Sequence, residues 1–480
     1  MFRFTIVISV FLVLGGCVIF KPAKRDKSPL EIPARYSLHA DSSDNEPGGG
    51  RKKWWRAFNS EELNGLIARA LSGGFDIETA RARFSRAYAA ARKINAEAMP
   101  VLRYEAGAKT KRARTKISSS KRETVSGESS WRLNMAASYE IDLWGRANSL
   151  RRAGAVDVEA ARKDLEAAAV TVSAKVAETW IDIIAVRRKI GILEKQIKAN
   201  ADMLEIQKMR FLNGMTNALD LSRQREAVAA IKAEKPLLRL QETRLVNSLA
   251  FLLGMASAKG LEISQKTVPG LIPMPGSGLP ADLLGNRPDV RAAALRLKSA
   301  DWEVSAASAN LFPSISLSAQ SVFSNENLNL LFENWITTLA ASLAGPIFDG
   351  KRRKAEVERA RATARERLIF YARTVARAVR EVEDSMAEEN LRQVYLKLLK
   401  ERLKAARATL KNALVIYRNG RGDYLSYLNA LTGAQRFERE LVWERASLAK
   451  SRVALYRALG GDWTKDLPNF AKKNKKKSSP

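Results

Sequence analysis

Apolar and polar side chains alternate along several short stretches of this 480-residue chain. Between Trp131 and Leu143 every odd-numbered position is apolar, whereas the positions between them are mostly polar. The same alternation runs over residues 102–109, 315–323 and 335–343. A period of two residues is that of a β-strand, whose successive side chains point to opposite faces. The pattern therefore predicts two β-hairpins, whose strands each have one apolar and one polar face.

A second pattern, with apolar residues three and four positions apart, predicts very long helices. Residues 351–418 contain neither glycine nor proline, which at ~1.5 Å per residue allows roughly 100 Å of unbroken helix. Its apolar stripe consists of Tyr371, Val375, Val379, Val382, Met386, Leu391, Val394 and Leu398. Residues 155–212 predict a second such helix, interrupted only by Gly191. Returning helices are expected over about 217–253, with a kink at Pro236, and 423–459. Helices of this length must pack as coiled-coil-like pairs.

The chain also repeats itself, which is a signature to be sought before individual elements are assigned. The dipeptide Asn213-Gly214 recurs as Asn419-Gly420, and in each half another glycine follows 40 positions later, at Gly254 and Gly460. Each half therefore predicts a helix, a hairpin, a very long helix, a turn and a long helix. We expect two copies of one structural unit, over residues 54–265 and 266–463.

The composition supports long helices and disfavours catalysis. Hydrophobic residues make up 46% of the chain and aromatic residues only 7%, a mixture typical of extended helical proteins. One histidine (His39) and one cysteine (Cys17) exclude most metal sites and every catalytic device that needs a histidine near a folded core. We therefore predict no catalytic residues, no metal site and no cofactor.

The formal net charge of +31 requires a partner or a compartment that accommodates it. Lysine and arginine run through nearly the whole chain, and no zinc-finger or RNA-binding motif accompanies them, which disfavours nucleic acid as the partner. Phosphates of a membrane or of lipopolysaccharide would satisfy the same charge. A basic coiled-coil scaffold or nucleic-acid-binding protein is the alternative from another class. Residues 464–480, rich in lysine, are expected to form a basic disordered tail.

The N-terminus indicates the compartment. One arginine precedes an apolar run of about a dozen residues, which is too short to span a bilayer and is typical of a secretory signal peptide over residues 1–16. The sequence Leu14-Gly15-Gly16-Cys17 resembles a bacterial lipobox, so we predict lipidation of Cys17. An incidental cysteine in an ordinary signal peptide is the alternative. Residues 17–53 are rich in proline and glycine and predict a lipidated tether.

The two-faced strands fit either a soluble sheet packed on helices or a membrane barrel. Aromatic residues near the strand ends, Trp131, Tyr139, Phe323 and Trp335, are typical of an interfacial girdle and favour the membrane. A barrel in lipid must close, and the smallest barrels have about eight strands. Because one chain supplies four strands, we predict an oligomer that pools them.

Several motifs, taken in order, resemble the TolC/OprM-type outer-membrane efflux channels, in particular the lipoprotein branch that serves RND pumps. The resemblance covers about residues 54–463. Its motifs are Trp54-Trp55-Arg56-Ala57-Phe58, Tyr139-Glu140-Ile141-Asp142-Leu143-Trp144-Gly145-Arg146, Arg287-Pro288-Asp289, Phe312-Pro313, Gly345-Pro346-Ile347-Phe348-Asp349-Gly350 and Tyr417-Arg418-Asn419-Gly420.

This resemblance implies a mainly α-helical protein with a transmembrane β-barrel part. It implies a homotrimer with a 12-stranded barrel and a 12-helix periplasmic tunnel, in the outer membrane of a Gram-negative bacterium. The implied function is a passive exit duct for drugs or small toxic compounds. The implied partners are a periplasmic adaptor protein and an inner-membrane pump of RND type. An outer component of type I protein secretion is the alternative within the class.

The turns between the long helices are the other candidate functional positions. Asn213, Gly214, Asn419 and Gly420 suit tight turns that need positive φ, and in the resembling family such tips also meet the adaptor. Asp423 is placed to cap the last long helix, and it also matches the acidic ring that narrows the pore in that family. Arg421 is its candidate partner in a closed mouth.

A basic segment remains between the first two strands. Residues 111–130 include Lys111, Arg112, Arg114, Lys121 and Arg122 and make the first copy longer than the second. We predict an extracellular loop there, with its cations near lipopolysaccharide phosphates. A merely solvated basic loop is the alternative.

Overall fold

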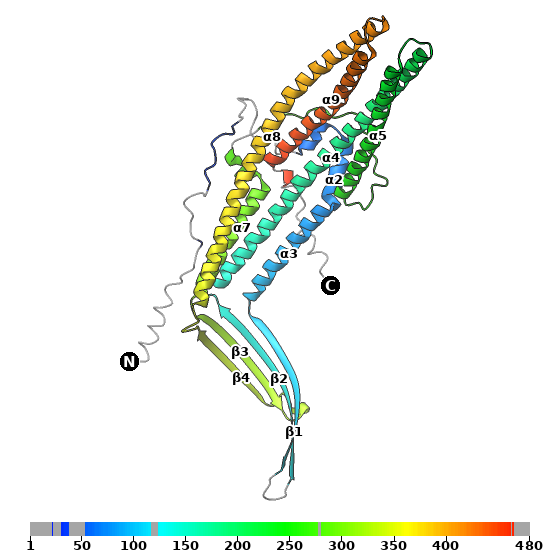
Figure 1. Ribbon diagram of the computed structural model, residues 1–480. Helices are drawn as coiled ribbons and strands as arrows, with labels where there is room; N and C mark the ends of the chain where they lie inside the picture. The colour runs from blue at the N-terminus through cyan, green and yellow to red at the C-terminus, as the bar shows by residue number, and fades with distance from the viewer. Residues whose placement is uncertain are drawn as a thin grey trace. The chain divides into compact units, whose positions relative to one another are not determined.

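The computed structural model describes residues 22, 30–37, 53–116, 123–276, 280–461 and 463–464. Within them, the same order of elements occurs twice (Figure 1). The first copy consists of α3 (Phe75–Glu97), β1 (Val101–Lys116), β2 (Glu123–Ile141), α4 (Arg146–Leu212) and α5 (Ala218–Leu252). The second consists of α7 (Pro288–Ala309), β3 (Ser314–Asn325), β4 (Trp335–Ala344), α8 (Arg352–Arg418) and α9 (Tyr424–Leu459). The predicted internal repeat is confirmed.

Shorter elements accompany the two copies. They are η1 (Trp54–Phe58), α2 (Glu61–Gly73), η2 (Pro280–Asp282), α6 (Leu283–Asn286) and η3 (Leu328–Leu330). The predicted signal peptide, Cys17 and His39 lie outside the described residues, as do most of the tether and of the basic tail. The expected boundary between the copies, at residues 265 and 266, falls between α5 and η2 and stays a prediction.

The two long helices α4 and α8 have the same length, 67 residues each. The predicted start of α4 at residue 155 was wrong, since the helix begins at Arg146 and runs through Gly154. A Cβ atom at Gly154 would lie 3.2 Å from Ile94 Cδ1, so this glycine permits close packing of α3 against α4 rather than ending the helix. Gly191 likewise lies inside α4, and α5 continues through Pro236.

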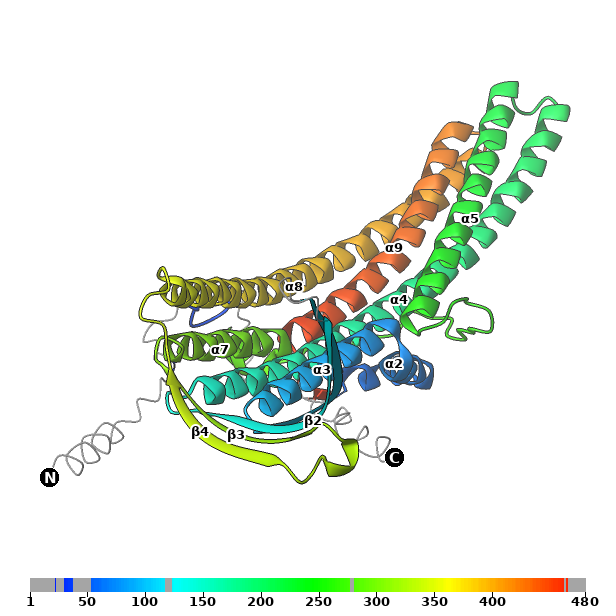
Figure 2. The same cartoon turned by 90° about the horizontal axis from the view of Figure 1, so that it is seen from below.

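The four predicted strands are confirmed as one antiparallel sheet in the order β1-β2-β3-β4. Figure 2 shows the strands side by side in a curved sheet. The predicted loop over residues 111–130 was largely wrong, because β1 continues to Lys116 and β2 begins at Glu123. Backbone pairing of Lys111 with Glu128 and of Lys116 with Glu123 extends the first hairpin beyond the second.

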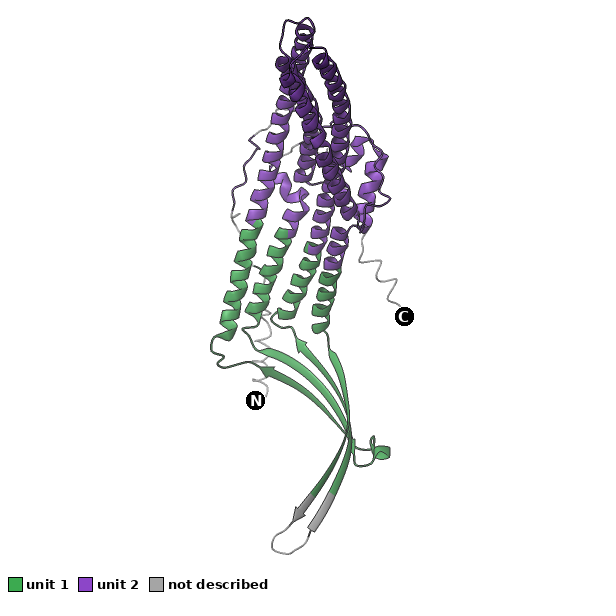
Figure 3. Ribbon diagram, turned by 45° about the vertical axis from the view of Figure 1, so that its right-hand side comes forward, with its two compact units in different colours: residues 1–29, 85–160, 293–371 green, residues 30–84, 161–292, 372–480 purple. Residues whose placement is uncertain are grey.

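The chain divides into two compact units (Figure 3). Unit 1 comprises residues 1–29, 85–160 and 293–371 and holds the sheet with the adjoining helix segments. Unit 2 comprises residues 30–84, 161–292 and 372–480 and holds the larger, C-terminal parts of α4 and α8 with α5 and α9. Each repeat contributes to both units, so the units do not coincide with the repeats. No helix in the described ranges is both long enough and apolar enough to cross a membrane.

Aromatic residues form much of the core of unit 2. The ring of Trp54 stacks on Tyr456 with centroids 5.8 Å apart, and Trp55 meets Trp463 edge-on at 4.7 Å. Trp180 of α4 is fully buried, and its Nε1 donates to the Glu62 carboxylate at 2.6 Å. These contacts join η1, α2, α4 and α9 into one core.

The predicted single apolar stripe of α8 is in fact two stripes. Val375, Val382 and Met386 are buried, but Leu391 and Leu398 are 70% and 55% exposed. The step from residue 386 to 391 is five positions, which at about 100° per residue carries the side chain away from the buried face. That face continues instead through Glu389, Leu396, Leu399 and Leu403.

Candidate functional site

The apolar face of the sheet contains the four predicted girdle residues, at two levels. Trp335 begins β4 and pairs with Phe323, the neighbour of Leu133 in the register. The expectation that Trp131 lies near a strand end was wrong, because β2 and its pairing with β1 continue beyond it to Glu123. Tyr139 lies eight positions along β2 from Trp131, which at ~3.3 Å per residue is roughly 26 Å. On a strand tilted by about 40° this distance is roughly 20 Å along the membrane normal, somewhat less than the apolar band of about 25 Å that a membrane barrel presents to lipid.

The opposite face of the sheet is polar, and its side chains bond to one another across strands. Gln320 donates to Asn134 at 3.0 Å, and the hydroxyls of Ser316 and Ser342 lie 2.7 Å apart. Cross-strand bonds of this kind leave a hydrated face that still holds the strand register. This is the alternation expected of strands with lipid on one side and water on the other.

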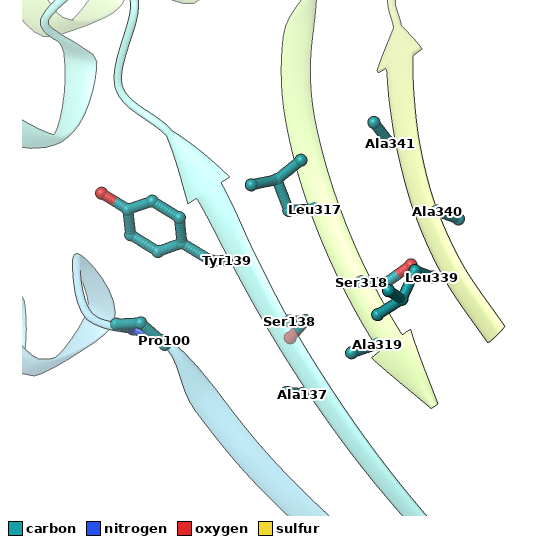
Figure 4. A pocket seen from close by; sticks show the side chains of 10 residues that line it. All are labelled: Pro100, Ala137, Ser138, Tyr139, Leu317, Ser318, Ala319, Leu339, Ala340 and Ala341. Carbon is teal, nitrogen blue, oxygen red and sulfur yellow. The ribbon is translucent and has the colours of Figure 1, made fainter. Parts of the chain in front are cut away.

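A hollow of about 410 Å³ crosses the sheet near its helical end (Figure 4). Tyr139, Leu317 and Leu339 surround a floor formed by alanine side chains of the same face. Small residues at Ala137, Ala319 and Ala341 create the hollow because they leave space beside these larger neighbours.

The sheet is open at both edges. Within the described residues, β1 pairs only with β2 and β4 pairs only with β3. An edge with free backbone groups cannot persist in hydrocarbon, because each unsatisfied group costs several kcal/mol. One chain therefore cannot complete a barrel.

Residues of two sequence motifs meet where strands pass into helices in unit 1. The Asp142 carboxylate accepts from the backbone N–H groups of Ala147 and Asn148, at 2.9 and 2.7 Å, and so caps the start of α4. Trp144 donates to the Pro313 carbonyl at 2.7 Å and stacks on Phe312 with ring centroids 4.7 Å apart. The motifs that support the resemblance thus form the connection between the two hairpins and their helices.

The Arg287-Pro288-Asp289 motif forms a buried ion cluster in unit 2. Arg287 is 7% exposed, pairs with Asp289 at 2.7 Å and with Glu381 at 2.8 Å, and donates to the Ala458 carbonyl. Burial opposes ionisation of Asp289, but the bonds and charge of Arg287 outweigh it and lower the pKa of that carboxyl. The cluster fixes α7 to α8 and α9. Sequence reasoning did not identify Glu381, which no motif marks.

The two turns predicted at Asn213-Gly214 and Asn419-Gly420 close the helical hairpins in the same way. Gly214 and Gly420 have φ of 69° and 73°, in the left-handed region that favours glycine. At the first turn, Met215 N–H donates to the Arg210 carbonyl and Gly214 N–H to the Phe211 carbonyl. This is the Schellman arrangement, and the second turn repeats it.

Each turn is followed by a capped helix. The side chain of Asn217 accepts from Asp220 N–H at 2.8 Å, and that of Asp423 accepts from Ser426 N–H at 2.7 Å. The capping role predicted for Asp423 is therefore confirmed. The Ser426 bonds, followed by the charge of Arg223, lower the pKa of the Asp423 carboxyl. In the described part of one chain no ion pair joins Asp423 to Arg421, so the predicted ring between chains stays a prediction.

A buried cluster near these turns connects the two hairpins. Tyr417, Tyr424 and Tyr427 pack with ring centroids 5.4 to 6.0 Å apart. The Tyr424 hydroxyl donates to Gln224 Oε1 at 2.5 Å, and Gln207 Nε2 donates to the Tyr417 hydroxyl at 2.7 Å. Both glutamines are fully buried. The sequence analysis missed this cluster, although Tyr424 and Tyr427 lie three positions apart at the start of α9 and Tyr417 lies at the end of α8.

The described residues contain no group of three or more potential metal-binding side chains of the His, Cys, Asp and Glu types. The features that remain are an open sheet with one apolar and one polar face, and long helices paired into hairpins. Together they define a subunit of an oligomeric membrane channel.

Comparison with known proteins identifies the family. The outer membrane efflux protein family matches residues 66–255 and 279–461, and the chain belongs to it. Pyoverdine export outer membrane protein OpmQ of Pseudomonas aeruginosa is 29% identical over 472 residues, which cover 97% of this chain and 98% of that protein. The solved outer-membrane channel OprN superposes with a TM-score of 0.81 at 25% identity, over 92% of this chain and 99% of that one. The Campylobacter jejuni CmeC channel superposes at 0.83 with 20% identity, over 96% and 98% of the two chains, which shows the shared fold.

The expected class, fold and location are thereby confirmed. The protein is an outer-membrane efflux channel subunit of a Gram-negative bacterium, with the repeated barrel-and-tunnel fold of trimeric channels. The alternative of a basic coiled-coil scaffold or nucleic-acid-binding protein is wrong.

Proposed function

We propose that the channel is a passive exit duct for small molecules that an inner-membrane pump delivers to it, and that it performs no covalent chemistry of its own. The single observation that carries this is the match to the efflux family along both repeats of a chain with channel-forming strands. Relatives named for export of pyoverdine, toluene and antibiotics support small molecules as cargo.

Deleting the gene and measuring the susceptibility of the cells to a panel of toxic compounds tests this function. We expect greater susceptibility, restored by the intact gene but not by a copy truncated before β3. Unchanged susceptibility together with retention of a normally secreted protein would favour type I secretion instead.

A periplasmic adaptor and an inner-membrane pump, of the RND type, complete the proposed assembly. The adaptor contacts the tips at Asn213, Gly214, Asn419 and Gly420. Exposed apolar side chains around the first tip support this contact, because apolar patches that face water commonly mark protein-interaction sites. They are Met209, Leu212, Met215 and Leu219, exposed by 57% to 75%. Crosslinking from the tips, followed by mass spectrometry of captured inner-membrane proteins, tests the partners.

The tips also form the proposed gate. Three copies of Asp423 approach one axis, with Arg421 of the same or a neighbouring chain between them, because like charges resist close approach unless cations intervene. The tyrosine cluster holds the α8/α9 hairpin against the α4/α5 hairpin, so opening requires its hydrogen bonds to break.

Two membrane contacts complete the proposal. Cys17 carries acyl chains that anchor the N-terminus, and mass spectrometry of the mature N-terminal peptide tests this; an unmodified Cys17 contradicts it. The long first hairpin carries cations such as Lys109, Lys111 and Arg112 toward lipopolysaccharide phosphates at the outer surface. Protease cleavage in this hairpin on intact cells supports that placement, and cleavage only from the periplasmic side refutes it.

A further inference from the structure

The hollow of about 410 Å³ on the apolar face of the sheet extends from β2 across β3 to β4 (Figure 4). Ala137 pairs with Ala319 on its floor, and Tyr139 pairs with Leu317 one step nearer the helices. The middle strand β3 has partners on both sides within the chain. A neighbouring chain that pairs with the free edge of β4 therefore lies beside the hollow and not over it. The hollow faces the membrane.

The position of the hollow along the strands places it in the periplasmic leaflet. Tyr139 lies two residues before the end of β2, and Leu317 lies three residues after the start of β3. At ~3.3 Å per residue, both lie within roughly 10 Å of the strand ends that lead into helices. One leaflet supplies about 15 Å of hydrocarbon. Because the helices extend into the periplasm, the hollow lies at the depth of phospholipid acyl chains of the periplasmic leaflet, and far from lipopolysaccharide at the outer surface.

A basic segment begins α8 at the same end of the sheet. Lys351, Arg352 and Lys354 are exposed, and none of the three forms an ion pair with another residue in the described part of the chain. The acidic residues next to them in the sequence already pair with other arginines, namely Asp349 with Arg353 and Glu356 with Arg359. Three cations are therefore available to an anion from outside the chain.

Hydrogen bonds fix where this basic segment lies relative to the hollow. Arg353 donates to the carbonyls of Asn310 and Phe312, at 2.8 and 3.3 Å, so the first turn of α8 lies beside the start of β3. Leu317 follows Phe312 by five positions, which at ~3.3 Å per residue is at most roughly 17 Å. This distance is close to the hydrocarbon thickness of one leaflet, about 15 Å. One phospholipid is therefore long enough to reach from the cations to the hollow.

We propose that each chain binds one anionic phospholipid of the periplasmic leaflet, with an acyl chain in the hollow and the phosphate at Lys351, Arg352 and Lys354. A flexible acyl chain fills the hollow and makes the dispersion contacts that a gap would lose. Clustered cations at a membrane surface attract anionic headgroups. An acyl chain carried by Cys17 would bring no such headgroup, so we assign the site to a separate lipid. The proposal rests on the outer-membrane location and not on the cargo or the pump.

Native mass spectrometry of the full-length trimer tests the site by counting the lipids that the trimer retains. The trimer is first incubated with an equal mixture of phosphatidylglycerol and phosphatidylethanolamine that have the same acyl chains. We expect one retained lipid per chain, with phosphatidylglycerol preferred by about fivefold. Filling the hollow with Ala137→Leu/Ala319→Leu should abolish retention. The control Ala106→Leu/Ala108→Leu makes the same two exchanges on the same face of β1, outside the hollow, and should retain lipid as the parent does.

A second variant tests the headgroup contact without altering the barrel. Lys351→Gln/Arg352→Gln/Lys354→Gln should lose the preference for phosphatidylglycerol. The control Lys397→Gln/Lys400→Gln/Lys404→Gln removes the same charge from exposed positions in the far part of α8 and should keep the preference.

Three results would overturn the proposal. Equal retention by the parent and the filled variant, in intact trimers, would show that the hollow is not the site. An unchanged preference in the glutamine variant would show that the basic segment does not bind the headgroup. Retention that appears only after Cys17→Ser would show that the acyl chain of Cys17 itself occupies the hollow.

Discussion

Replacing Tyr424 by phenylalanine removes a single hydroxyl from the cluster that joins the two hairpins. That hydroxyl donates to Gln224 Oε1 at 2.5 Å, and the Gln224 side chain is fully buried. Gln224 keeps its other bond, from Nε2 to the Asn200 carbonyl at 2.7 Å. The substitution therefore leaves one buried amide oxygen without a donor and changes little else in the packing.

The cost follows from the burial of that oxygen. A buried acceptor left without its partner costs about 1–3 kcal/mol. If opening separates the hairpins, water reaches Gln224 in the open state, and only the closed state bears this cost. The closed-to-open ratio should then fall by roughly 5–150-fold per chain. Burial raises the pKa of the Tyr424 hydroxyl, so it remains a donor at neutral pH and the effect should not vary there.

Single-channel recording in planar bilayers measures this change as a higher open probability or conductance. Tyr427→Phe is the matched control, because Tyr427 belongs to the same cluster but the structure gives its hydroxyl no hydrogen bond within the described residues. Equal effects of the two variants would refute the reasoning. So would a loss of thermal stability in Tyr424→Phe without any change in conductance, since the bond would then support the fold and not the closed state.

Three further predictions concern other parts of the chain. Arginine at Leu133, on the apolar face of the sheet, should cost ~2–4 kcal/mol near the bilayer midplane, whereas arginine at Asn134 should be tolerated; heat-modifiability on gels compares them, and equal responses would contradict the assigned faces. Asp423→Asn keeps the helix cap and removes the charge, so it should raise conductance as Asp423→Ala does. Unchanged conductance in Asp423→Asn would show that the residue serves as a helix cap alone. In the folded protein the pKa of the Asp423 carboxyl is lowered. The stabilisation by ionised Asp423 should therefore be present at neutral pH and disappear as the pH falls through this lowered pKa. Glu389 of α8 and Arg452 of α9 form a buried ion pair. Glu389→Met should leave the Arg452 guanidinium without this counter-charge and destabilise the fold by about 3–5 kcal/mol in thermal unfolding, while replacing both residues by apolar ones should recover much of the loss.

Elements with a strong local period could be predicted from the sequence. The strands were predictable because alternate side chains must face different solvents, as at Leu133 and Asn134. The tips were predictable because Gly214 and Gly420 fill backbone positions with positive φ. The strands and the turns depend on residues that are close together in the sequence, so a local pattern is enough to predict them.

Features that depend on distant contacts were not predictable. Gly154 reads as a helix breaker until α3 is seen to pack against it. The apolar residues of α8 were predicted to form one stripe, because the hydrophobicity of a residue does not indicate which neighbouring helix it packs against. The bond from Tyr424 to Gln224 joins residues 200 positions apart, and no local pattern marks such a pair. The extra length of the first hairpin read as loop because basic residues have no strong strand preference.

The equal length of α4 and α8 limits how such a chain can change in length. Each added residue advances a helix by ~1.5 Å and rotates everything beyond it by about 100°, so a single insertion in α8 would turn the part beyond it away from α9. Only changes of about seven residues, which make two helical turns, preserve the facing side chains. They must occur together in α4, α5, α8 and α9 for the turns to stay level. The reach of this channel into the periplasm is therefore expected to vary among relatives in steps of two helical turns, about 10 Å each.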